Sequence, residues 1–459
     1  MSVAYVPCEW KSAVVVPVFK KGASGSVGNY RPISLTCVAS KIMERLVSDK
    51  ITNHLLANNI LHNAQHGFLK RRSTTTNLIE CFNDWTVCVQ DRCQMTVVYI
   101  DFKKAFDVVS HEKLFHRLYH YGIRGNVLLW LKNFFTGRTH QTRVDSSLSD
   151  LADLSSGIIQ GSGIGPIMFL SYINELIALL ETYGIVVKAF ADDVKMYVRI
   201  VNDVNLLQLQ HALDSLLRWA EEWQLTISTD KCCVLNIGQL VLLPELMMYD
   251  QVLPNVNSVR DLGINVTNYL SSSDHVCDIA AKAHKRASLI HRCFVSRNTD
   301  LLVRAFKVYV RPLLEFNSVI WSPSTIHDIE MIESVQRRFT KRLHGLYSFP
   351  YKSRLQHLNL QSLEHRRLLT DLVWCYKIVF GLVVVNSNSN DLFEFSTLSH
   401  TRGHRYKLFK KSNSRNIRAD LFSERVINVW NKLHTDMDFS SLSTFKCILA
   451  SMDFSDYLH

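Results

Sequence analysis

Two adjacent aspartates, Asp192 and Asp193, lie between two short runs of β-branched and aromatic residues. Such runs favour strands, and a join this short favours a tight hairpin with both carboxylates at its tip. Neighbouring carboxylates repel each other, which costs little on a solvated turn, so an ordinary surface turn is one interpretation. The other is a site for divalent cations, because Mg²⁺ takes oxygen ligands from carboxylates and substrate phosphates.

The cation interpretation needs a further carboxylate, and Asp101 follows the apolar run Val97–Ile100. A buried strand that ends in an acid is unusual on packing grounds alone. If this strand lies beside the hairpin, three carboxylates meet at one edge of a sheet. Such a group can hold two Mg²⁺ ions about 3.5–4 Å apart, the arrangement used in polymerase-type displacement.

The elements that must position these acids follow from hydrophobic periodicity. We expect a strand over 14–19, a cationic Gly/Ser loop over 20–32 and a helix over 39–56. An apolar helix begins at about residue 167, and a long helix covers about 204–223. From about residue 275 the pattern becomes helical, with helices expected over 276–293, 300–314 and 326–343.

Charge is unevenly distributed along the 459 residues, which carry a net charge of +11. Residues 281–459 hold 27 Lys and Arg against 15 Asp and Glu, whereas residues 1–280 are nearly neutral. A polyanion such as nucleic acid is the natural partner of the basic part. Basic, solvated helices without a ligand are the alternative.

The eleven cysteines include no paired CxxC motifs, which predicts reduced thiols, no zinc site and a location in the nucleus and/or cytoplasm. No secretory signal is recognised at the start of the sequence. The longest weakly charged stretch, residues 157–180, contains Gln160, Pro166 and Glu175, and it is too polar for a membrane span. We therefore expect no membrane partner.

Several motifs occur in one order along the chain, and each is weak alone. They are NYRPISLT (29–36), HGFLKRRST (66–74), DFKKAFDVVSH (101–111), QGSGIGP (160–166), FADD (190–193), LTISTDKC (225–232), DLGI (261–264), RPLLEF with WSP (311–323), VQRRFTKR (335–342), RGHRY (402–406) and RVINVWNKL (425–433). The ordered set resembles reverse transcriptases of non-LTR (LINE-type) retrotransposons, in particular the jockey-like group. The resemblance covers almost the whole chain.

The resemblance implies an α+β fold of the right-hand polymerase type. It implies a reverse transcriptase domain over 1–266, with N-terminally truncated fingers over about 1–95 and a ferredoxin-like palm with an antiparallel sheet over about 96–266. A helical thumb over 275–345 and a mostly helical, basic C-terminal region over 350–459 would follow. The implied activity is RNA-directed DNA synthesis, in which deoxynucleotides (dNTPs) are added to the 3′-hydroxyl of a DNA primer on an RNA template.

The catalytic aspartates of the family map onto Asp101, Asp192 and Asp193, and the backbone carbonyl of Phe102 maps onto a further ligand of two Mg²⁺ ions. Successive strand residues point to opposite faces, so we expect Asp192 to contact metal more directly than Asp193. Lys231 resembles the lysine that protonates the leaving pyrophosphate, with a surface lysine as the alternative.

Other motif residues are implied to contact the nucleotide. Phe106 matches the position that excludes ribonucleotides, since an aromatic face offers a 2′-hydroxyl no hydrogen bond; the alternative is a core phenylalanine. Gln160 and Gly161 match the segment under the nascent base pair, where glycine permits close approach; the alternative is a plain turn before a helix.

Two groups of cations are implied to bind phosphates through the guanidinium fork or simple charge. In the fingers, Arg31 together with Arg71 or Arg72 would meet the triphosphate or the template. In the thumb, four residues would hold the duplex backbone without reading its sequence: Arg337, Arg338, Lys341 and Arg342.

Some features depart from the family pattern. The sequence contains no apurinic-type endonuclease and starts inside the fingers, Ser228 stands where the family usually has Asn, and residues 238–253 are unusually apolar. These departures suit a partial copy, so a catalytically impaired fragment that only binds nucleic acid is the alternative function. An unrelated basic helical interaction protein would leave the ordered motifs unexplained.

Overall fold

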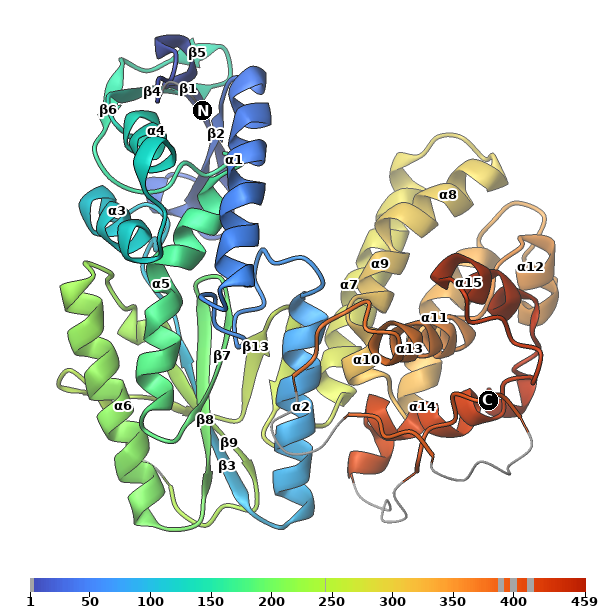
Figure 1. Cartoon of the computed structure of the whole chain (residues 1–459). Coiled ribbons are helices and arrows are strands. Elements are labelled where there is room, and N and C mark those ends of the chain that lie inside the picture. Colours follow the sequence, from blue (N-terminus) through green and yellow to red (C-terminus); the bar gives the residue numbers. More distant parts are fainter. Residues whose placement is uncertain (1–3, 244, 387–391, 397–402, 411–416) are drawn as a thin grey trace.

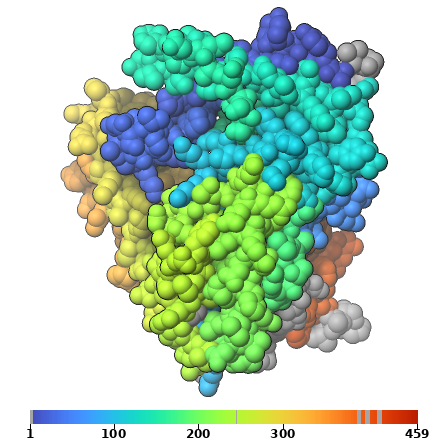
Figure 2. All heavy atoms as spheres, turned by 90° about the vertical axis from the view of Figure 1, so that its left-hand side faces the viewer, coloured from blue at the N-terminus to red at the C-terminus, as the bar shows by residue number. Residues whose placement is uncertain are grey.

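Two five-stranded sheets, two two-stranded sheets and a helical bundle make up the described part of the chain, which confirms the expected mixed α+β class (Figure 1). The computed structural model describes residues 4–243, 245–386, 392–396, 403–410 and 417–459. Seen from the side of helix α6 (Asp203–Glu222), the blue and teal residues of the N-terminal part lie above the green residues (Figure 2).

The N-terminal sheet has the strand order β2-β1-β4-β5, with β6 also paired to β4. Its strands are β1 (Ser12–Phe19), β2 (Tyr30–Leu35), β4 (Arg138–Val144), β5 (Ser147–Leu148) and β6 (Ala152–Leu154). The loop expected over 20–32 is too long, because Tyr30–Pro32 pair with β1. Pro32 is tolerated there because β2 is an edge strand.

Helices α1 (Val38–Ala57), α3 (His111–His120) and α4 (Gly125–Phe135) lie in the same part of the molecule as this sheet. The side chain of Ser110 accepts a hydrogen bond from the Lys113 amide at 3.5 Å and caps α3.

The central sheet is built in the order β12-β9-β3-β8-β7. The strands are β3 (Gln94–Ile100), β7 (Val186–Phe190), β8 (Asp193–Ile200), β9 (Cys233–Gly238) and β12 (Asn255–Val256). Strand β3 is antiparallel to both β8 and β9, and β7 and β8 form the expected hairpin, with only Ala191 and Asp192 between them. The strand that ends before Asp101 is therefore a direct neighbour of the hairpin.

The two faces of the central sheet belong to two different hydrophobic cores. Val98 and Ile100 of β3 pack into a core with α5 (Gly165–Glu181) and α6. Met95 and Val97 pack into the other core with α2 (Thr74–Gln90) and the helical bundle. This alternation is the period of two that a strand imposes, and Figure 1 shows α2 on the side of the sheet away from α6.

A hairpin of β13 (Ser258–Asp261) and β14 (Ile264–Thr267) leads into the helical bundle. Its helices are α7 (Ser273–Cys293), α8 (Thr299–Tyr309), α9 (Arg311–Glu315), α10 (Ser318–Trp321), α11 (Ile326–Lys341), α12 (Tyr351–His357), α13 (Leu363–Val379), α14 (Phe422–Asn431) and α15 (Leu442–Ser451). The single helix expected over 300–314 is wrong: α8 ends at Tyr309 and α9 begins at Arg311, because Pro312 has no amide to continue the hydrogen-bond pattern of α8.

Helix α2 joins the helical bundle to the central sheet. The side chain of Asn317 contacts Thr74 and Thr75 at the start of α2, and Arg418 donates to Asn83 at 3.3 Å. The Val384 amide donates to the Arg71 carbonyl at 2.9 Å just before α2. The same side of the sheet and the bundle also share one hydrophobic core. Among the described residues, no helix has the length and apolarity needed to cross a membrane.

Candidate active site

Adjacent strand ends bring the sequence-predicted carboxylates together. Asp101 directly follows β3, Asp193 begins β8, and Ile100 pairs with Val194 in the register of these strands. Asp101 and Asp193 line one cavity of about 140 Å³ with Lys195, Lys231 and other residues. The cavity lies on the sheet face that meets α2 and β13, since Asn77 and Asp261 complete its wall.

The hairpin tip carries more negative charge than its surroundings neutralise. Partial desolvation of its carboxylate raises the pKa of Asp193 to about 6, although the residue stays exposed, and the charges of Asp192, Asp261 and Asp101 add to this rise. Burial and then the charge of Asp101 also raise the pKa of Asp192, although Arg31 and Lys20 oppose the shift. An excess of carboxylate charge of this kind favours a bound cation.

The two adjacent aspartates occupy different surroundings. Asp193 shares the cavity with Asp101, whereas Asp192 belongs to the turn and lies outside that cavity wall. Within the described part of the chain, no three Asp, Glu, His or Cys side chains are grouped closely enough to hold a metal ion by themselves. Any dication here must therefore take oxygens from substrate or water as well, as Mg²⁺ usually does.

Lys231 is brought to Asp101 by a segment that runs beside residues 101–103. The Lys103 amide donates to the Thr226 carbonyl at 2.7 Å, and the Ser228 amide donates to the Asp101 carbonyl at 2.8 Å. Lys231 ends a short 3₁₀ turn, Thr229–Lys231, and its Nζ lies 3.0 Å from Asp101 Oδ1. A proton donor thus stands beside one of the carboxylates and faces solvent.

Phe106 and Gln160 are each held in place by neighbouring residues. The Phe106 ring stacks on Phe169 with centroids 4.1 Å apart and remains half-buried. Gln160 donates to the Asp107 carboxylate at 2.7 Å, and its carbonyl accepts from the Ser34 amide at 2.7 Å. The segment after Asp101 is therefore tied to β2 through Gln160.

Gly161 is required by close backbone approach. Its φ of +115° lies in the range that side chains rarely adopt, and a Cβ would lie 2.6 Å from the Ser34 carbonyl oxygen. The close approach observed is to the Ser34 carbonyl of β2, and the placement of Gly161 under a base pair stays a prediction.

The three fingers arginines differ in what they contact. Arg31 is exposed, and its charge acts on Asp192. Arg72 is half-buried and donates to Asn63 and, at 3.4 Å, to the Gln65 carbonyl. Burial lowers the pKa of Arg72. The third arginine, Arg71, donates to the Gly381 carbonyl. Arg72 is thus engaged within the protein rather than directed at the carboxylates.

The four cations at the C-terminal end of α11 also divide into two groups. Arg337 forms a two-point ion pair with Glu330, at 2.6 and 3.0 Å, and lies over the Tyr351 ring. Arg338, Lys341 and Arg342 are exposed, and their spacing places them on one side of the helix end. These three form the surface that can meet a phosphate backbone.

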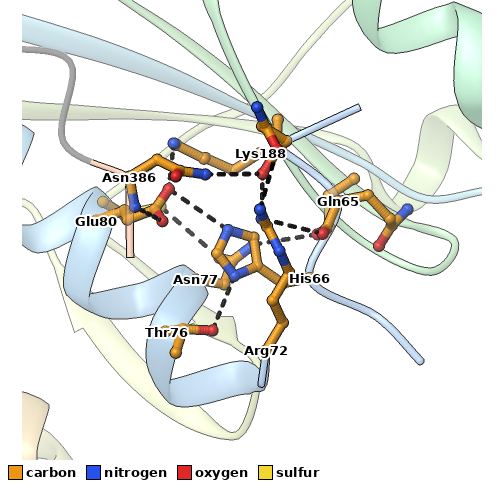
Figure 3. A network of polar contacts seen from close by, with 12 residues as sticks. Gln65, His66, Arg72, Thr76, Asn77, Glu80, Lys188 and Asn386 are labelled. Atoms are coloured by element: carbon orange, nitrogen blue, oxygen red, sulfur yellow. Dashed lines mark hydrogen bonds and ion pairs between the residues drawn. The ribbon is translucent and has the colours of Figure 1, made fainter. Parts of the chain in front are cut away.

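Sequence reasoning missed a polar network behind the hairpin (Figure 3). Glu80 of α2 forms a buried ion pair with Lys188 of β7 and accepts from the Asn386 amide at 2.6 Å. His66 lies 3.4 Å from Glu80 and 2.8 Å from the Thr76 hydroxyl. The available signal was Lys188 within the apolar strand VVKAF, because a buried lysine needs a partner.

Comparison with known proteins identifies the chain. Residues 18–266 match the family described as Reverse transcriptase (RNA-dependent DNA polymerase), which is more than half of the sequence. The chain belongs to this reverse transcriptase family.

Its relatives include polymerases of non-LTR mobile elements from Drosophila melanogaster. It is 23% identical to the RNA-directed DNA polymerase from mobile element jockey, over 75% of this chain and 39% of that protein. It is 25% identical to the probable RNA-directed DNA polymerase from transposon BS, over 80% of this chain and 42% of that protein. The expected kinship is confirmed, and the chain spans about two fifths of the length of these relatives.

Among solved structures, apo telomerase from Candida tropicalis resembles the chain with a TM-score of 0.45 and 11% identity. That similarity covers 79% of this chain and 61% of the telomerase chain.

Proposed function

We propose that this chain is an RNA-directed DNA polymerase that extends a DNA primer with deoxynucleotides on an RNA template. The observation that carries the proposal is the convergence of Asp101 and Asp193 on one cavity, beside Lys231. These residues come from three separate motifs, and all lie inside the region that matches the reverse transcriptase family. The implied fingers (1–95), palm (96–266) and thumb (275–345) form part of the same proposal.

Reverse transcriptases generally use divalent metal, and the donors present here suit it. The Asp101, Asp192 and Asp193 carboxylates are oxygen donors, and desolvation, together with the charges of neighbouring carboxylates, raises the pKa values of the last two. Together with the Phe102 carbonyl they would hold two Mg²⁺ ions. When bound, such ions neutralise phosphate charge and lower the pKa of the primer hydroxyl.

The chain's own groups then act on the substrate. Lys231, held beside Asp101, donates a proton to the departing pyrophosphate. Phe106, backed by Phe169, occupies the volume that a 2′-hydroxyl would need. Gln160 and Gly161 support the nascent base pair from a segment that is itself fixed to β2. Arg31 meets the triphosphate.

The template–primer duplex is held by the exposed cations of α11. Arg338, Lys341 and Arg342 contact phosphates, which gives affinity without sequence preference. Arg337 supports the helix through Glu330 and Tyr351 instead.

Primer extension on an RNA template with Mg²⁺ tests the proposal. The wild-type chain should incorporate deoxynucleotides, and Asp101→Asn should abolish incorporation while binding of the RNA–primer duplex remains. Asp145→Asn is the matched control, because Asp145 is exposed and its φ of +52° suits asparagine equally well. A folded wild-type chain that binds RNA without incorporation would leave nucleic-acid binding alone as the function.

A further inference from the structure

The outer edge of strand β7 is covered by the loop at residues 64–67. Strand β7 is the edge strand of the central sheet, so its outward amides and carbonyls need partners. The Ala189 amide donates to the Ala64 carbonyl at 3.0 Å, and the Ala189 carbonyl accepts from the His66 amide at 2.9 Å. The loop thus pairs with β7 as one parallel bridge.

Ala191 is the next residue whose amide faces outward along this edge, and its partner is the Gln65 side chain instead of a backbone group. Its Oε1 accepts from the Ala191 amide at 2.9 Å and from the Gly67 amide at 2.7 Å. Its Nε2 lies 3.5 Å from the Ala191 carbonyl. Gln65 is only 2% exposed, so its carboxamide is committed to the turn that joins β7 to β8.

The turn needs such a support because Ala191 has an unfavourable backbone conformation. Its φ is +58°, and the left-handed region costs a residue with a Cβ about 1–2 kcal/mol. The next two residues are Asp192 and Asp193, so any relaxation of Ala191 moves both carboxylates. The two hydrogen bonds to Oε1 oppose that relaxation.

The loop that carries Gln65 is itself held from behind (Figure 3). His66 lies between Thr76 and Glu80 of α2. Arg72 donates to the Gln65 carbonyl at 3.4 Å and to the Asn63 side chain at 3.2 Å. The Gln65 backbone is therefore anchored on α2, and its side chain extends from a fixed point to the turn.

We propose that Gln65 is a positioning residue of the polymerase, whose carboxamide fixes the Ala191 turn and so the placement of Asp192 and Asp193. This inference rests on the proposed function. Gln65 does not touch substrate; it acts through the backbone of the hairpin. A residue that served folding alone would change stability without changing turnover per folded molecule.

Two substitutions in the full chain separate positioning from folding. Gln65→Met keeps the length and shape of the side chain but removes both acceptor contacts. We expect it to lower kcat for single-nucleotide incorporation by about tenfold to a hundredfold, the scale of a sub-ångström to 1 Å misplacement. KM for the deoxynucleotide should change by less than about threefold, since no substrate contact is lost.

Gln65→Glu retains acceptor oxygens for the Ala191 and Gly67 amides. It should keep kcat within about fivefold of wild type at pH 8. Rescue by glutamate together with loss in methionine is the pattern that positioning requires.

Hydrogen exchange of the Ala191 amide gives a readout that does not depend on activity. Exchange should be about tenfold faster in Gln65→Met and near wild type in Gln65→Glu. Unchanged exchange in a folded Gln65→Met, full activity of that variant, or equal loss in both variants would overturn the proposal.

The same measurements separate failure of the inference from failure of the proposed function. If wild type does not polymerise, the proposed function fails, while exchange still reports whether Gln65 holds the turn. If Gln65→Met does not fold, Gln65→Leu, which also lacks an acceptor, replaces it in the comparison with Gln65→Glu. Faster Ala191 exchange and lower kcat in a folded Gln65→Leu support the proposal, and wild-type exchange with full kcat in that variant contradicts it.

Discussion

Gly67 is the residue whose substitution the structure constrains most tightly near the hairpin. A Cβ added to Gly67 would lie 2.4 Å from the Ala191 nitrogen and 3.1 Å from the Ala191 Cα. Both are backbone atoms, so no side-chain rotation removes the clash. Ordinary contact begins at 3.4 Å, and therefore Gly67→Ala must separate the loop from the turn by about 1 Å.

This displacement acts directly on the two residues after Ala191. A misplacement of about 1 Å costs on the order of a hundredfold in rate when it affects catalytic groups. We expect kcat of Gly67→Ala to fall by that factor in single-nucleotide primer extension, with duplex binding unchanged. Overpacking also destabilises a core by about 1–3 kcal/mol, so thermal unfolding should begin at a lower temperature.

Gly25→Ala is the matched control, because a Cβ at Gly25 has no heavy atom within 4 Å. It should leave kcat and unfolding temperature at the wild-type values. If Gly67→Ala also kept kcat within about threefold of wild type, the turn would tolerate a shift that the geometry says catalysis does not tolerate. That result would refute the link between the loop and the hairpin.

Three further predictions concern charge. The pKa of Asp193 is raised to about 6 in the folded state, so ionisation of this carboxyl opposes folding. The protonated carboxyl therefore contributes stability that is complete below the ordinary pKa of 3.8 and is lost as pH rises through 6. Asp193→Asn should therefore stabilise the metal-free chain at pH 8 by on the order of 1 kcal/mol, a value discounted for solvent exposure, and urea unfolding should show no gain at pH 3. Lys231→Met should lower kcat by about tenfold or more and remove the basic limb of the pH–rate profile, whereas Lys231→Arg should retain more activity; equal profiles would exclude a proton donor. Arg338→Ala with Arg342→Ala should reduce the slope of log affinity against log salt by about two, while Arg337→Ala, which removes an internally paired cation, should leave the slope unchanged in a filter-binding titration.

Local patterns predicted the elements that carry the carboxylates. The apolar run before Asp101 and the short join at Asp192 each specify a strand end within a few residues, and both strands form. Their pairing in one sheet followed from the family resemblance and not from either run alone. Pro312 should have indicated the break between α8 and α9, since a proline inside a helix removes one backbone hydrogen bond to the preceding turn.

The residues that each cation contacts could not be predicted from local sequence patterns. The sequence shows that Arg72 and Arg337 are cations, but it does not show that Asn63 and Glu330 already bind them. The argument that successive strand residues point to opposite faces does not apply to Asp192, because Asp192 lies in the turn before β8. Such outcomes depend on which groups meet in space, and no spacing rule encodes them.

The network around Glu80 shows why distant segments decide the geometry of the hairpin. Burial alone would raise the pKa of Glu80, yet His66 and Lys188 outweigh it and lower the pKa, so the carboxylate stays charged. A buried charge pair contributes little net stability, but loss of one partner is costly because the other charge remains unpaired. The pair therefore fixes β7 to α2 at one register, and the Asn386 amide adds the C-terminal region to the same carboxylate. The loop with Gln65 is anchored on this assembly, so the placement of Asp192 and Asp193 depends on contacts that span more than 300 residues of sequence.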